Sequence, residues 1–132
     1  MLAYLLALLS LLVLDALWLG VLARDFYQTS LGALLRPDFD PWAAGVFYLV
    51  YVAGLFHFAV RPARRTGAAL HAVRDGALLG GLAYATYELT NLATLPGWPL
   101  RVVVVDVLWG AALSALVALV GYLVAGRGRR SD

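Results

Sequence analysis

Three acidic side chains stand inside long apolar stretches of this sequence. They are Asp15, Glu88 and Asp106, and no Lys or Arg shares those stretches with them. If the stretches lie in a bilayer, a charged side chain at mid-membrane costs about 2.5–3.5 kcal/mol, so acids are rare there without a purpose. A buried carboxyl group can hold a proton, bind a cation or act as a general acid. These three residues are therefore the first candidates for chemistry.

Aromatic and amide side chains share helical faces with the three acids. Asp15 lies three positions before Trp18, and Asp106 lies three positions before Trp109. Helical spacing also groups polar residues with the third acid, Glu88. These further residues are Tyr84, Tyr87 and Asn91. The sequence thus predicts a polar pocket of carboxyl, amide and hydroxyl groups, walled by Trp and Tyr rings and placed in the outer half of the membrane.

Three interpretations of this pocket stay open. In the first, protonated acids only hold helices together, with about 0.6 kcal/mol from each hydrogen bond. In the second, at least one carboxyl group ionises and binds a proton, a metal ion or an organic cation, and the aromatic rings add cation–π contacts. In the third, a carboxylic acid is a general acid acting on a lipid or isoprenoid. The leading hypothesis is binding or transport of a cation or small amphipathic molecule. An intramembrane enzyme and an accessory subunit without a ligand are the alternatives.

Residues that are missing or misplaced narrow the chemistry. The absence of cysteine excludes disulfides, thiol catalysis, iron–sulfur clusters and thiolate zinc sites. Both histidines, His57 and His71, fall toward the membrane side opposite the acids, so no metal site is expected among the acids. No phosphate-binding glycine loop or haem attachment motif is present, and we expect no cofactor. The formal net charge of +2 is too small to suggest a nucleic-acid partner.

The elements that position the acids are long apolar segments. Hydrophobic residues make up 63% of the 132 residues and charged residues only 14%, which favours a bilayer over water as the solvent. A spanning helix needs roughly 20 mostly apolar residues. Four segments meet this need: 2–22, 42–60, 76–95 and 102–124. We therefore predict one all-α integral membrane domain over residues 1–132, a four-transmembrane-helix antiparallel bundle.

Proline and glycine set the expected connections. Arg61-Pro62 is expected to stop the second segment, because proline lacks a backbone donor and cannot continue a helix. The run 96–99, Pro-Gly-Trp-Pro, leaves room only for a tight turn, so the third and fourth segments should pack as an antiparallel hairpin. Gly80-Gly81 and Gly110 should allow close approach of helices.

Arginine placement predicts the orientation. The connection between the second and third segments and the C-terminal tail are rich in arginine, and the positive-inside rule places them in the cytoplasm with both termini. The arginines concerned are Arg61, Arg64, Arg65, Arg74, Arg127, Arg129 and Arg130. Tyr27, Trp42 and Trp98 then fall at the outer interface. We expect a multi-pass protein of the bacterial inner membrane, with membrane lipids as partners. A homodimer is also expected, because one small bundle encloses little volume.

Two short runs echo each other at opposite ends of the chain. The first segment contains Asp15-Ala-Leu-Trp18, and the fourth contains Asp106-Val-Leu-Trp109. A glycine follows each tryptophan within two residues. A decayed duplication of a two-helix unit, convergence and chance are all compatible with this echo.

Several of these runs together carry a family resemblance. They are Tyr-Ala-Thr-Tyr-Glu-Leu-Thr-Asn-Leu-Ala-Thr-Leu at 84–95, Gly-Trp-Pro-Leu at 97–100, Val-Asp-Val-Leu-Trp-Gly at 105–110, Asp15-x-x-Trp18-Leu19-Gly20 and Phe26-Tyr27. The chain resembles, over essentially its whole length, a bacterial family of small membrane proteins catalogued as domain of unknown function 2177. The usual family acid at the position of Glu88 is Asp, a departure that keeps the acid chemistry and alters its reach. The resemblance implies four membrane helices and brings no established activity.

Overall fold

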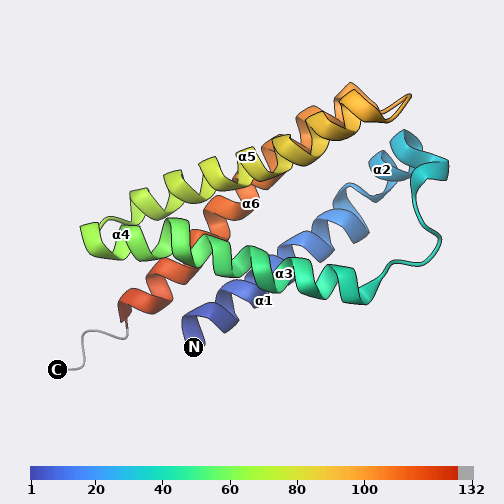
Figure 1. Ribbon diagram of the computed structural model, residues 1–132. Helices are drawn as coiled ribbons and strands as arrows, with labels where there is room; N and C mark the ends of the chain where they lie inside the picture. The colour runs from blue at the N-terminus through green and yellow to red at the C-terminus, as the bar shows by residue number, and fades with distance from the viewer. Residues whose placement is uncertain (128–132) are drawn as a thin grey trace.

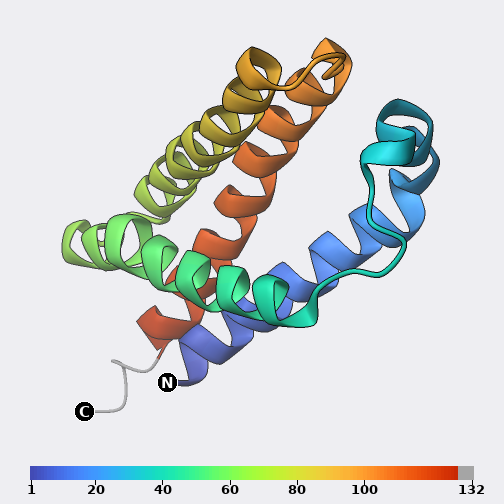
Figure 2. The same ribbon diagram turned by 45° about the vertical axis from the view of Figure 1, so that its right-hand side comes forward.

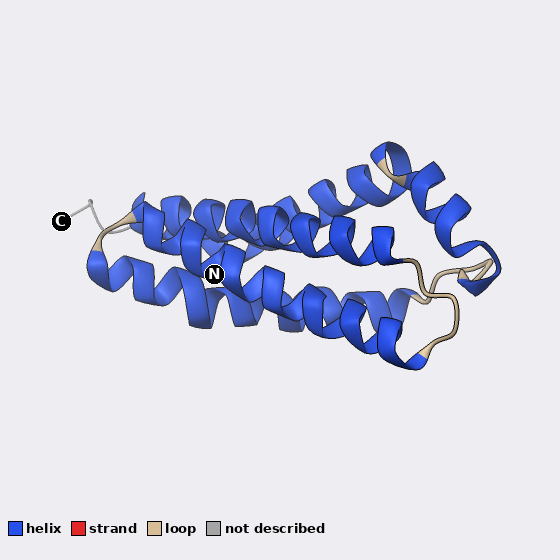
Figure 3. Cartoon of the chain, turned by 90° about the horizontal axis from the view of Figure 1, so that it is seen from above, coloured by secondary structure: helices blue, strands red, loops and turns tan. Residues whose placement is uncertain are grey.

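The computed structural model describes residues 1–127, and this part of the chain consists of helices and loops with no strand (Figures 1 and 3). In chain order its elements are α1 (Leu2–Leu17), the π-helical turn η1 (Trp18–Leu22), α2 (Arg24–Leu31), the 3₁₀ turn η2 (Gly32–Leu34), α3 (Pro41–Leu55), the π-helical turn η3 (Phe56–Val60), α4 (Arg61–Thr66), α5 (Ala69–Thr94) and α6 (Leu100–Arg127). Arg129 and Arg130, which enter the orientation argument, lie outside the described residues.

Three helical segments among the described residues are long and apolar enough to cross a membrane. They are Leu2–Leu22, Pro41–Thr66 and Leu100–Gly126. The remaining long helix, α5, has 26 residues but a less apolar composition, because it carries Glu88 together with tyrosine, threonine and asparagine side chains. The expected all-helical membrane architecture is confirmed, and α5 as a fourth crossing stays a prediction.

Helices α5 and α6 form the predicted antiparallel hairpin and run side by side in both ribbon views (Figures 1 and 2). The turn between them contains Gly97, whose φ of 76° lies in the left-handed region that glycine enters without a steric penalty. Close approach depends on glycine as well. A Cβ atom built at Gly80 would overlap the carbonyl oxygen of Gly110 and the side chain of Ser114. The expected role of Gly80 and Gly110 is therefore confirmed.

Helix α3 starts where Asp40 caps it. The Asp40 carboxylate accepts hydrogen bonds from the backbone N–H groups of Trp42 and Ala43, at 3.0 and 3.1 Å. Pro41 occupies the first turn of α3. Backbone N–H groups in a first turn have no acceptor within the helix, so the missing N–H group of proline costs no hydrogen bond there.

The same helix continues past the residues expected to stop it. Pro62 lies in the first turn of α4, directly after the π-helical turn η3, in which the N–H group of Arg61 bonds to the carbonyl oxygen of Phe56. This wider turn lets the chain pass Pro62 without a break. The helix ends instead at Thr66, where Gly67 adopts a left-handed conformation with φ of 72°. The expectation that Arg61-Pro62 ends the second segment was wrong.

Two apolar clusters hold the bundle together. The larger one joins α1, α3, η3, α4, α5 and α6, and its fully buried side chains include Leu11, Val52, Leu55, Leu113 and Val117. The smaller one packs Ala23 and Tyr27 of the α2 region against Val102 of α6, with Trp18 and Trp98 beside them. The short helix α2 is therefore fixed to the start of α6.

Candidate functional site

Asp15 is buried between the helices α1, α3 and α6. Its side chain is 6% exposed. The hydroxyl of Tyr48 on α3 donates to Oδ2 at 2.7 Å, and the indole N–H of Trp109 on α6 donates to Oδ1 at 3.3 Å. Both carboxyl oxygens thus accept hydrogen bonds, which fixes Asp15 as a structural acceptor between α1, α3 and α6.

Asp106 is contacted from outside the long helices. The hydroxyl of Tyr27 on α2 donates to its Oδ1 atom, and Tyr27 in turn accepts a hydrogen bond from the indole N–H of Trp18 at 3.0 Å. Burial raises the pKa of Tyr27 above its ordinary range, and the hydrogen bond to Asp106 raises it further. The Tyr27 hydroxyl therefore stays protonated at neutral pH and remains a donor to Asp106.

Glu88 on α5 is fully buried. The indole N–H of Trp98, in the turn before α6, donates to its Oε2 atom at 2.8 Å. Its Oε1 atom has no hydrogen-bond partner among residues 1–127. The carboxyl group of Asp106 lies close enough to that of Glu88 for direct interaction. Since an unpartnered buried oxygen is rare and costly, the Oε1 atom of Glu88 is the candidate atom of this site for holding a proton or contacting a ligand.

A stacked tryptophan pair connects the two halves of the site. The rings of Trp18 on η1 and Trp109 on α6 lie 4.4 Å apart with an angle of 9° between their planes. Each tryptophan is linked to the acid of the other helix. Trp109 donates a hydrogen bond to Asp15, and Trp18 donates to the hydroxyl of Tyr27, which donates to Asp106. The two Asp-x-Leu-Trp runs thus interlock across antiparallel helices, and this geometry gives both runs a common structural purpose.

Helices α3 and α5 enclose an aromatic groove. Figures 1 and 2 show α3 diverging from α5 with distance from α4. A cavity of about 340 Å³ lies there, lined by Phe47, Tyr51, Ala83, Tyr84 and Tyr87. Its walls are mostly aromatic carbon, which suits an apolar or aromatic ligand.

Tyr84 lies between this aromatic groove and the acids. It lines the groove and lies within electrostatic reach of both Asp15 and Asp106. Its ring covers Gly110 so closely that no Cβ atom fits at that position. Tyr87 lines the groove too, and its ring meets Trp98 edge to face at 6.3 Å. Tyr84 and Tyr87 thus line the groove and also contact residues next to the acids, Tyr84 at Gly110 and Tyr87 at Trp98.

The structure brings together most, though not all, of the predicted pocket. Asp15, Trp18 and Trp109 form one set, which is joined through Tyr27 to a second set of Asp106 and Glu88. Asn91 is half-buried, and its side chain makes no hydrogen bond with the described residues, so it is not joined to either set.

Two residues predicted to lie at the outer interface also contact the acids. Tyr27 contacts Asp106, and Trp98 contacts Glu88. Ser114, which sequence analysis did not single out, is buried and lies 2.7 Å from the hydroxyl of Tyr51. Trp98 directly follows the Pro-Gly turn that brings the chain back along α5. This turn could have indicated from the sequence that Trp98 lies near Glu88. Tyr27 had no comparable signal.

The two histidines lie apart from the acids. Within residues 1–127, no group of three or more His, Asp or Glu side chains is arranged to hold a metal ion. His71 is hydrogen-bonded to Thr66 at 2.7 Å, and His57 lines a cavity with Arg61 on another part of the surface. Carboxyl groups of this kind can exchange protons, form hydrogen bonds, bind cations or act as general acids.

Comparison with known proteins gives one match. Residues 1–123 match the model of a family described as predicted membrane protein (DUF2177). Neither the curated proteins nor the solved structures contain a match. Since the match covers nearly the whole chain, the resemblance found in the sequence is confirmed: the chain belongs to this family and is a membrane protein with several apolar helices.

Proposed function

We propose that this member of the DUF2177 membrane protein family binds a cationic, amphipathic molecule at the Glu88–Asp106 pair and exchanges it for a proton. The observation that carries the proposal is the Oε1 atom of Glu88, which is buried, lacks a hydrogen-bond partner among the described residues and belongs to a carboxyl group close to that of Asp106. Burial away from water disfavours two neighbouring negative charges. A single proton or a single cation relieves that repulsion.

The neighbouring groups favour an organic cation over a bare ion. The groove beside Tyr84 is aromatic and about 340 Å³ in volume, large enough for a small apolar body. Aromatic faces attract organic cations, and desolvated cation–π contacts contribute about 2 kcal/mol. An amphipathic molecule would place its apolar part in this groove and its charge toward the acids.

The proposal includes a membrane arrangement. Four helices cross the bacterial cytoplasmic membrane, with α5 as the fourth crossing and both termini inside. The excess of arginine between α3 and α5 supports this orientation. Glycine contacts that fix α5 along the apolar helix α6 support α5 as a membrane helix. The acids of this arrangement lie in the outer half of the bilayer.

A binding measurement tests the proposal. Tetraphenylphosphonium, a lipophilic aromatic cation, is titrated into the detergent-purified protein between pH 5 and pH 8. Affinity is expected to increase with pH, because protons compete with the cation for the acid pair. Glu88→Gln is expected to reduce the affinity at least about tenfold, since one charge-assisted contact is lost.

Asp25→Asn is the matched control, because Asp25 is an exposed carboxylate in the first turn of α2. It is expected to bind like the wild type. Equal affinity of wild type and Glu88→Gln at every pH would refute the proposal.

The second candidate is an intramembrane enzyme with Glu88 as a general acid, and the aromatic groove beside the acids is the observation that favours it. An enzyme would change the lipid or isoprenoid profile of cells that express the wild type, and the change would vanish with Glu88→Gln. An unchanged profile together with pH-dependent binding favours the binding protein.

A further inference from the structure

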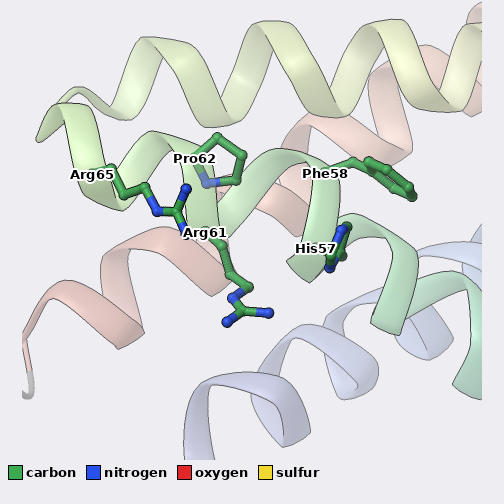
Figure 4. A pocket seen from close by; sticks show the side chains of 5 residues that line it. All are labelled: His57, Phe58, Arg61, Pro62 and Arg65. Atoms are coloured by element: carbon green, nitrogen blue, oxygen red, sulfur yellow. The ribbon is translucent and has the colours of Figure 1, made fainter.

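A second cavity lies at the segment η3–α4 and is lined by positively charged side chains. It has a volume of about 500 Å³ and is lined by His57, Phe58, Arg61, Pro62 and Arg65 (Figure 4). All five residues come from the continuous segment η3–α4. No residue of the acid site lines it, so its ligand is independent of the proposed function.

The backbone of this segment aligns the charges. His57, Arg61 and Arg65 are spaced four positions apart, and η3 widens the helix at the first of these steps. Figure 4 shows the side chains of Arg61 and Arg65 on α4 and those of His57 and Phe58 on η3, which precedes α4 in the chain. Turns of π-helix occur often at functional sites, since they change which side chains share a face. Here the common face carries two guanidinium groups and an imidazole.

No acid in the described part of the chain neutralises these groups. The ion pairs among residues 1–127 are Arg36–Asp40 and Arg74–Asp75, and neither involves Arg61 or Arg65. Two arginines that line the same cavity repel each other unless an anion lies between them. The fork of N–H donors on arginine matches the oxygens of a phosphate group.

The cavity also has an apolar wall. The Phe58 side chain is 60% exposed, and Pro62 lines the same cavity. The segment forms the end of the apolar stretch Pro41–Thr66, which is long enough to cross a membrane. In the proposed membrane arrangement this end of the stretch lies at the depth of the phospholipid headgroups, where arginine can face the headgroups and an aromatic side chain the first acyl carbons.

We infer that this cavity binds the phosphate headgroup of an anionic phospholipid. Arg61 and Arg65 hold the phosphate oxygens, and His57 adds a donor on the same face. Phe58 and Pro62 pack against the glycerol and the first acyl carbons. Charge complementarity favours an anionic lipid over a zwitterionic lipid, whose headgroup carries a compensating positive charge.

The test is lipid binding by native mass spectrometry of the full chain. Phosphatidylglycerol and phosphatidylcholine with identical acyl chains are offered at equal concentration. The wild type is expected to prefer phosphatidylglycerol. The double variant Arg61→Gln/Arg65→Gln is expected to lose roughly tenfold or more of its affinity for phosphatidylglycerol, since each arginine near an anionic headgroup contributes to binding.

A second double variant, Arg64→Gln/Arg74→Gln, removes the same net charge from the same connection without touching this cavity. It is expected to keep the preference of the wild type. Equal loss in both double variants would show attraction by the general basic surface and overturn the inference. Wild-type affinity in Arg61→Gln/Arg65→Gln would also overturn it. Soluble glycerol phosphate is the last arm, and binding as tight as that of phosphatidylglycerol would replace the lipid by a free phosphate ligand.

Discussion

Replacing Gly80 by Ala is expected to destabilise the protein by about 1–3 kcal/mol, the usual effect of an added methyl group in a tightly packed interior. The methyl group would overlap the backbone carbonyl oxygen of Gly110, which has no rotamer through which to move away. Helices α5 and α6 would have to separate at this point. Because Tyr84 also packs over Gly110, their separation would disturb the wall of the aromatic groove.

The measurement is unfolding by sodium dodecyl sulfate, followed by circular dichroism of the purified protein. Gly81→Ala is the matched control on the next residue of α5, where the added atom meets the Cβ atom of Ala111 at 3.7 Å, an ordinary contact. Its stability is expected to equal that of the wild type or slightly exceed it, because Ala favours helix more than Gly does. Equal destabilisation by both variants would contradict the close α5–α6 contact at Gly80.

Replacing Trp109 by Ala is expected to cost about 3 kcal/mol of stability, the lower end of the range for Trp→Ala in a core, because the side chain is half-buried. Two contacts disappear together. The ring stack with Trp18 is lost, and Asp15 keeps only Tyr48 as a donor. The variant should therefore weaken the packing of α1 against α6.

Trp42→Ala is the matched control, because Trp42 is 84% exposed at the start of α3. A substitution at such a position usually changes stability by less than about 0.5 kcal/mol. The same unfolding experiment compares the two variants. If Trp109→Ala were as stable as Trp42→Ala, the stacked pair would have no role in holding the two Asp-x-Leu-Trp runs together.

The bounds of a helix could be predicted from the sequence where the length of the apolar stretch alone determines them. The predicted segment 2–22 matches α1 and η1 at both ends, and 102–124 lies inside α6. The second segment was predicted too short, because the effect of Pro62 depends on the π-helical turn before it. Proline by itself indicates a break, and only the preceding hydrogen-bond pattern decides whether the helix continues.

The acids and their tryptophans also followed from residue type and spacing. Asp15, Glu88 and Asp106 stand out because charged residues are rare in apolar segments. Trp18 and Trp109 each lie three positions after an aspartate, on the same face of the helix. Their actual donors depend on contacts across the fold. Tyr27 reaches Asp106 over 79 positions from a short polar helix that resembles any connecting loop in its composition. Helical periodicity contains no information on such a contact.

Asn91 is the opposite case, a residue that was predicted for the site from its helical face. It shares a predicted face with Glu88 one turn away, yet its side chain joins no hydrogen bond of the described site. A helical face of polar residues includes positions beyond the reach of the neighbouring helices. The rotation and length of those neighbours decide which members of the face enter the site.

Proton release on cation binding is the direct measure of exchange at the Glu88–Asp106 pair. Tetraphenylphosphonium is added to the purified protein in weakly buffered solution near neutral pH, and the released protons are counted per bound cation. We expect release of about one proton per cation, because the Glu88–Asp106 pair exchanges a single positive charge. Binding of the cation without proton release, or equal release by wild type and Glu88→Gln, would contradict it.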